Sequence, residues 1–267
     1  MKIGICTSLE KAPLAVDAGF DYVELSVAEM TMREPWDTTR YAGLPIEAAN
    51  LFFPGGVKLF PIDRSEGIDV LDYLRKARPR ITEIGVKVGV VGSGNQRRCP
   101  AELQFPMVSD DPYWNGAENA EEILARYLAE GLKMPGETVF APESLERSET
   151  NVGGDCASFS RMLAKYGVGY TADAYHLLKE WDADGREGGL DTPSRAFWAD
   201  QLPHSPTHLH MAQLEGRRYP QPNDPMLNGF FERLRELGYN ERVSLECNGL
   251  EPSEYRQAIA NLKTYFG

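Results

Sequence analysis

The sequence predicts a single α/β domain, a closed (β/α)8 barrel of parallel strands. Short apolar runs alternate with stretches that are apolar at helical spacing, and this alternation repeats eight times in 267 residues. No linker-like change of composition, tandem repeat or low-complexity tract divides the chain, so we expect one domain over residues 1–267. A doubly wound open sheet is the alternative, but it would not need eight units.

The expected strands are short apolar runs that end at turn-forming or polar residues. The fifth run is broken by Pro142 and ends on the carboxylate Glu143. In chain order, the eight expected strands cover residues 2–6, 22–26, 48–53, 86–91, 138–141, 168–172, 207–211 and 242–245.

Helical periodicity fills the intervals between these strands. The clearest helix covers residues 117–134, with its apolar side chains on one face. We expect Pro79 to bend or interrupt the helix that follows the third strand. Thr192 is expected to cap a later helix with Pro193 at its first position, and Pro252 opens the last one.

The overall composition narrows the class of protein. A formal charge of −12 argues against a nucleic-acid partner, which normally requires a basic face. The four cysteines are scattered without CxxC spacing, which favours reduced thiols. No apolar run approaches the ~18–20 residues of a membrane span, and the chain enters a strand without signal-peptide architecture. We therefore expect a cytoplasmic protein that binds neither membranes nor nucleic acids.

Metal-ligand side chains stand at the ends of the last four expected strands: Glu143, Asp173, His210 and Glu246. In a barrel these positions are neighbours around one rim. One imidazole and three carboxylates form an oxygen-rich site that suits Mn²⁺, Mg²⁺ or Co²⁺ better than a thiolate zinc site. Each residue alone is more often a helix cap, a loop charge or a packing residue. Four at consecutive strand ends point to a metal site.

The histidines support this interpretation. His176 follows Asp173 by three residues, so it can point at the same mouth from the first turn of a helix. His208 and His210 share one face of a strand. We expect His210 to be the ligand, because it lies nearer the carboxyl end, and His208 to lie in a buried layer below. His204 is expected to be a surface or packing residue.

Three further charged residues have open roles. Glu24, at the end of the second expected strand, could line the pocket or cap the next helix. Arg97 and Arg98 follow a glycine-rich loop and could bind a phosphate or carboxylate. The alternative for both arginines is a solvated loop charge.

The chain also resembles the xylose isomerase-like TIM barrels, specifically the sugar isomerase/epimerase branch that includes ketose 3-epimerases and hydroxypyruvate isomerase. The resemblance covers essentially the whole chain. The motifs that carry it are GSGNQRRCP (92–100), PESLERSETN (142–151), DAYH (173–176), HLH (208–210) followed by RRYP (217–220), and SLEC (244–247).

The resemblance implies a single divalent ion held by the four strand-end residues, with Mn²⁺, Mg²⁺ or Co²⁺ favoured over Zn²⁺. It further implies that Glu149, His176 and Arg217 contact the substrate. A metal bound to a carbonyl oxygen and its neighbouring hydroxyl acidifies the C–H between them and stabilises the enediolate. Glu143 and Glu246, on opposite sides of that carbon, could exchange its proton.

These residues lead us to expect a metal-dependent isomerase or epimerase of a small keto-sugar or hydroxy-carbonyl compound. A lyase or dehydratase acting on a keto-glycoside or inosose is the first alternative, and a non-catalytic sugar-binding barrel is the second. A DNA-repair endonuclease of this fold is disfavoured, because it needs histidines before His176. Barrels of this kind often form homo-oligomers, but the sequence shows no interface signature.

Overall fold

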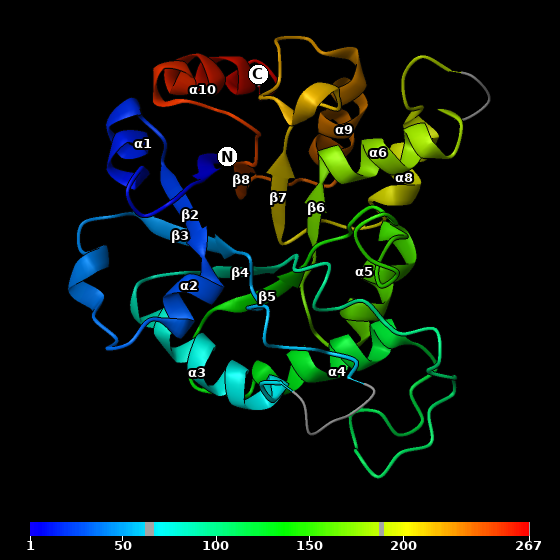
Figure 1. Cartoon of the computed structure of the whole chain (residues 1–267). Coiled ribbons are helices and arrows are strands. Elements are labelled where there is room, and N and C mark those ends of the chain that lie inside the picture. The colour runs from blue at the N-terminus through cyan, green and yellow to red at the C-terminus, as the bar shows by residue number, and fades with distance from the viewer. Residues whose placement is uncertain (62–66, 187–189, 267) are drawn as a thin grey trace.

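The predicted barrel is present in the structure, a computed structural model that describes residues 1–61, 67–186 and 190–266 (Figure 1). Its parallel strands form one eight-stranded sheet in the order β5-β4-β3-β2-β1-β8-β7-β6. The strands are β1 (Lys2–Cys6), β2 (Tyr22–Ser26), β3 (Ile46–Asn50), β4 (Val88–Val91), β5 (Val139–Pro142), β6 (Thr171–Asp173), β7 (His208–Met211) and β8 (Arg242–Leu245).

The two ends of this sheet meet between β5 and β6. Glu143 and Thr171 form an isolated parallel bridge, and the Gly169 amide donates to the Phe140 carbonyl at 3.1 Å. The ring is therefore nearly closed, with a less regular seam than the other strand pairs. Glu143, the first of the predicted metal ligands, lies at this seam.

Several strands differ from their expected bounds for local reasons. β3 ends at Asn50 rather than at residue 53, because Leu51 has a positive φ of 44° that turns the chain out of the extended conformation. β6 begins at Thr171 rather than at residue 168 and includes Asp173 as its last residue. The same Asp173 caps the following helix by accepting from the Tyr175 amide at 2.7 Å.

Helices cover the outside of the strand ring (Figure 1). The described helices are α1 (Ala12–Ala18), α2 (Val27–Met32), α3 (Val70–Glu83), α4 (Ala120–Gly131), α5 (Cys156–Lys165), α6 (Ala174–Ala183), α8 (Arg195–Gln201), α9 (Pro225–Glu236) and α10 (Tyr255–Lys263), with short 3₁₀ turns at Thr38–Tyr41, Glu215–Arg217 and Pro252–Glu254. Within the described parts of the chain, no helix combines the length and the apolar character that crossing a membrane requires.

Two helix predictions need correction. Pro79 does not interrupt α3, which continues to Glu83 because its apolar face stays packed in the core on both sides of the proline. Thr192 is not the cap of α8. Ser194 takes that role and accepts from the Phe197 amide at 3.0 Å, so Pro193 precedes the cap.

A small cluster of strand side chains is separate from the large core between strands and helices. It centres on Tyr22, which Gly4 accommodates: a Cβ at Gly4 would lie 2.3 Å from the tyrosine ring. Strand side chains alternate between the two faces of a sheet, so this cluster fills the interior of the barrel. Its members are Tyr22, Ala48, Val88, Val90 and Ala141.

Candidate metal centre and active site

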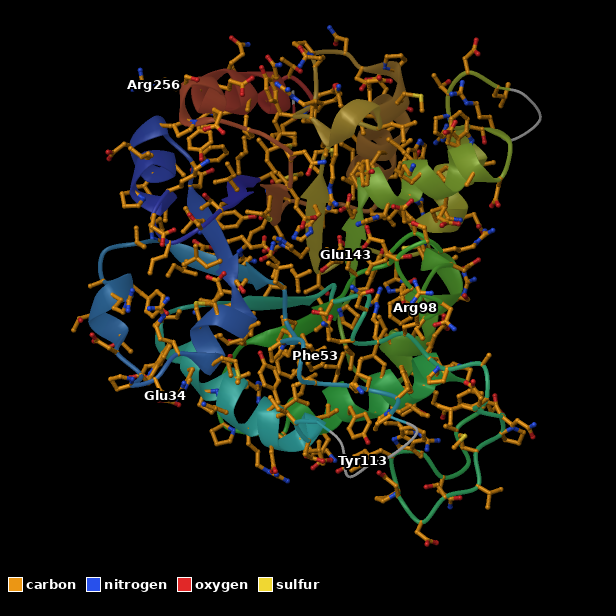
Figure 2. All side chains as sticks on the ribbon, in the orientation of Figure 1. Glu34, Phe53, Arg98, Tyr113, Glu143 and Arg256 are labelled. Atoms are coloured by element: carbon orange, nitrogen blue, oxygen red, sulfur yellow. The ribbon has the colours of Figure 1, made fainter. Side chains whose placement is uncertain are left out.

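The four predicted ligand residues converge at one end of the barrel. Glu143 follows β5, Asp173 ends β6, His210 lies in β7 and Glu246 follows β8. One ligand atom from each lies within 4.8 Å of the others. His210 Nδ1 is 3.3 Å from Glu143 Oε1 and 3.1 Å from Glu246 Oε2. Figure 2 shows Glu143 at the side of the strand ring where β5 and β6 meet. Three carboxylates and one imidazole around one point can hold a divalent cation.

Burial and hydrogen bonding in this cluster also fit a cation. Asp173 is 1% exposed, and within the described chain no group donates a hydrogen bond to its Oδ2. Burial, together with the charges of Glu143 and Glu246, raises the pKa of Asp173 to about 7. Burial raises the pKa of Glu143, but the charge and hydrogen bond of His210 together with the charge of His176 and a hydrogen bond with Asp173 outweigh burial and lower this pKa to about 2. An orphaned carboxylate oxygen among other acids is the electrostatic setting that a bound cation relieves.

The three predicted substrate-contact residues border the same cluster. His176, which is 2% exposed, places Nε2 3.7 Å from Asp173 Oδ2 and 3.9 Å from Glu143 Oε1. Glu149 lies beside His176, with ligand atoms of the two residues within 4.8 Å. The structure therefore brings Glu149 and His176 to the side of the centre formed by the loop after β5 and the first turn of α6.

Arg217 approaches the centre from the loop after β7. Its Nη2 donates to Glu246 Oε2 at 2.5 Å, and its Nε donates to the Glu246 carbonyl at 3.3 Å. The guanidinium lies 4.7 Å from the centre of the Tyr175 ring. The backbone of Arg217 has a positive φ of 51° next to Gly216, so a tight local turn directs this side chain.

The first glycine of the loop after β4 makes room for the centre. A Cβ at Gly92 would lie 2.9 Å from Glu143 Oε2, closer than side-chain atoms normally approach. The GSGNQRRCP motif therefore contributes space at this position, where a side chain would displace the Glu143 carboxylate.

Glu24 does not cap a helix, so that sequence-based role is wrong, and it contacts the candidate centre from inside the barrel through His210. Ser26 caps α2, and Glu24 is fully buried inside the barrel. Its Oε1 lies 2.9 Å from His210 Nε2, and its Oε2 lies 2.9 Å from His208 Nε2. His208 is itself fully buried, which confirms the expected layer beneath His210, and His204 packs edge-on against Tyr170 at 4.9 Å.

Arg97 is neither an anion-binding residue nor a solvated charge. It is fully buried, and it donates to the carbonyls of Val91 at 3.1 Å and of Glu143 at 2.5 Å. Burial lowers its pKa to about 10. Arg98 is exposed and donates to the Ser148 and Glu149 carbonyls at 3.0 and 2.9 Å. Both arginines therefore hold backbone next to the proposed site, a role that residue type and loop position alone do not reveal.

The fold and this site define a class of protein. It is a (β/α)8 barrel that carries side chains able to bind a metal at the carboxyl ends of its strands. The chain matches the family model described as xylose isomerase-like TIM barrel over residues 12–265, and it belongs to that family. The family expected from the sequence motifs is confirmed.

Solved structures with this fold include several sugar epimerases. D-psicose 3-epimerase from Clostridium cellulolyticum H10, crystallised with D-tagatose, has a TM-score of 0.70 and 16% identity, covering 100% of this chain and 98% of its own. The 3-keto-D-glucoside 4-epimerase YcjR from E. coli has a TM-score of 0.65 and 19% identity, covering 99% of both chains. The IolI protein, with a bound zinc atom, has a TM-score of 0.57 and 15% identity over 100% and 96%. No curated protein matches the sequence significantly.

Proposed function

We propose that this protein is a divalent-metal-dependent isomerase or epimerase of small keto-sugars that works through an enediolate. The convergence of Glu143, Asp173, His210 and Glu246 in one cluster carries this proposal. The substrate class is supported by the neighbours of this fold, which act on D-psicose, L-ribulose and 3-keto-D-glucosides by name. The chain would act as one domain without a nucleic-acid partner, in keeping with its formal charge of −12.

The four cluster residues would hold the ion, and their oxygen-rich set suits Mn²⁺, Mg²⁺ or Co²⁺. When bound, such an ion supplies Lewis-acid chemistry toward a substrate carbonyl. Glu143 and Glu246 come from β5 and β8, with β6 and β7 between them, so their carboxylates face a substrate from two sides. In our proposal one removes the proton next to the carbonyl and the other returns it.

The remaining proposed residues bind and orient the substrate. Glu149 and His176 offer an acceptor and a ring nitrogen to sugar hydroxyls on one side of the centre. Arg217 holds the Glu246 carboxylate through their hydrogen bond and keeps further N–H groups for a substrate oxygen. Return of the proton to the opposite face gives epimerisation, and return to the adjacent carbon gives isomerisation.

Solvent hydrogen exchange tests this proposal. The protein is incubated in D₂O with Mn²⁺ and a panel of D-fructose, D-tagatose, L-ribulose and a 3-keto-glucoside, and then with EDTA. We expect deuterium at a carbon next to the carbonyl of at least one sugar, and its loss with EDTA. A protein that binds Mn²⁺ but exchanges no hydrogen in any of these sugars would contradict the proposal.

A lyase acting on a keto-glycoside is the second candidate. The likeness to a 3-keto-D-glucoside 4-epimerase favours it, because an enolate formed beside a glycosidic bond can expel the aglycone. The same incubations separate the two candidates if the aglycone is assayed. Release of aglycone would favour elimination, whereas deuterium incorporation into intact glycoside would favour epimerisation.

A further inference from the structure

A continuous set of buried polar side chains lies beneath the proposed metal centre. Tyr22, Glu24, His208, His210 and Ser244 are all fully buried. They come from β2, β7 and β8, which lie on both sides of β1 in the sheet. An ionised carboxylate costs several kcal/mol to bury unless hydrogen bonds compensate it. The geometry around Glu24 provides that compensation.

Glu24 receives three hydrogen bonds from within the barrel. Ser244 Oγ donates to Oε2 at 2.5 Å, and His208 Nε2 and His210 Nε2 each lie 2.9 Å from one of its oxygens. The Tyr22 hydroxyl lies 2.8 Å from Ser244 Oγ. Because the serine proton is directed at Glu24, the tyrosine donates to the serine. The network is thus a chain of donors that ends on one carboxylate.

We propose that Glu24 is a positioning residue that fixes the ring nitrogens of His210 for metal binding. An ionised carboxylate only accepts hydrogen bonds, so His210 must carry its proton on Nε2. A neutral imidazole has one N–H, which leaves the lone pair of Nδ1 free to bind a cation. Nδ1 is the nitrogen that faces the cluster, 3.3 Å from Glu143 and 3.1 Å from Glu246.

The other neighbours of the two histidines also favour hydrogen on Nε2. The Cys6 thiol is the other neighbour of His210 Nε2, at 3.9 Å, and sulfur is a weak acceptor. In the described chain His208 Nδ1 has no hydrogen-bond partner, which fits the same Nε2–H tautomer for this second histidine. For a neutral His210, the state that binds a cation, the network therefore has one consistent set of donors and acceptors, and this set presents Nδ1 to the ion.

Metal affinity tests this role without relying on activity. Carboxylate partners of ligating histidines typically contribute about 10–100-fold in metal affinity. We would titrate Mn²⁺ into the full chain by calorimetry and compare wild type with Glu24→Gln, which keeps the shape and removes the charge. The matched control is Tyr22→Phe, which removes a buried hydroxyl from the far end of the network and leaves the contact between Glu24 and His210 intact.

We expect Glu24→Gln to weaken Mn²⁺ binding by about 10–100-fold and Tyr22→Phe to change it less than about twofold. Equal affinity of Glu24→Gln and wild type would overturn the role of Glu24. Equal losses in both variants would overturn it too, because they would report general destabilisation. The inference rests on the proposed metal site: a wild-type chain that binds no divalent ion would overturn the proposed function as well.

A second measurement needs no variant and covers the case in which Glu24→Gln does not fold. Zinc is diamagnetic, so long-range ¹⁵N–¹H spectra of the zinc-loaded protein with labelled histidine report which ring nitrogen carries hydrogen. We expect His210 to carry it on Nε2. If His210 carries its hydrogen on Nδ1, the inference is overturned. This holds whether or not zinc binds at another place in the protein.

Discussion

The two halves of the barrel contribute to the candidate site in different ways. The strands β5–β8 supply every member of the four-residue cluster, each at or just beyond a strand end. The half formed by β1–β4 supplies Glu24 and Arg97, which contact those residues from positions fully buried in the protein. One half thus presents the proposed ligand atoms at the rim, and the other contacts the same residues from buried positions.

The difference extends to hydrogen bonding. Glu24, on the supporting side, accepts from Ser244 and from two histidine rings. Asp173, on the rim, has a buried oxygen that receives no hydrogen bond from the described chain. Buried polar groups in proteins are normally satisfied, so an exception marks a place where a ligand belongs. The Glu24 carboxylate is thus saturated by donors inside the barrel, whereas the Asp173 carboxylate keeps an oxygen that a bound cation could use.

The largest expected effect comes from a rim residue. Glu246→Gln keeps an oxygen for the proposed ion but removes the carboxylate that would exchange a proton. We expect turnover to fall by roughly 10²–10⁴-fold, the usual contribution of general acid–base catalysis, while substrate still binds. Steady-state kinetics and substrate titration measure the two quantities, with metal content checked in both proteins.

Glu241→Gln is the matched control for this variant. Glu241 directly precedes β8, at the opposite end of the strand, and is exposed. It should leave turnover unchanged. Near-normal activity of Glu246→Gln would remove this carboxylate from the mechanism and weaken the distinction between a catalytic rim and a supporting half.

A smaller effect is expected from Arg97, in the half of the barrel formed by β1–β4, and it concerns the stability of the protein. Arg97→Met keeps most of the buried stem but removes the donor that Arg97 supplies to the Glu143 carbonyl. The Val91 carbonyl also loses Arg97, yet it still accepts from the Glu143 amide at 3.2 Å. An unsatisfied buried acceptor costs about 1–3 kcal/mol, and removal of a buried charge offsets part of that. We expect the free energy of unfolding to fall by about 1–3 kcal/mol in urea denaturation.

The neighbouring arginine provides the comparison. Arg98→Met removes a side chain that also bonds two carbonyls, but an exposed one whose acceptors water can reach. A change below about 0.5 kcal/mol is expected there. Equal stability changes in the two variants would mean that burial does not distinguish these adjacent arginines.

The four clustered residues at the strand ends could be predicted from the sequence, whereas the roles of the buried residues that contact them could not. Glu143, Asp173, His210 and Glu246 each follow an apolar run, and parallel strands bring such positions together whatever the details of packing. Glu24 also lies in an apolar run, but its partner His208 is 184 residues away, and only the closed barrel brings them into contact. Arg97 and Arg98 are identical in type, and the path of the loop after β4 decides which one is buried.

The smallest effect is expected at Arg217, which lies beside the rim and holds the Glu246 carboxylate. Arg217→Lys keeps the positive charge and the positive backbone φ, but a lysine cannot make both contacts with Glu246 or stack on Tyr175 as a guanidinium does. Loss of one charged hydrogen bond, worth about 1.5 kcal/mol, predicts a decrease in kcat/KM of about tenfold. Arg218→Lys, at an exposed residue that pairs with Glu254 at 3.0 Å, should stay within about twofold of wild type. If both variants keep wild-type kcat/KM, charge alone suffices at residue 217, and the orientation of Glu246 then depends on the strand end rather than on this arginine.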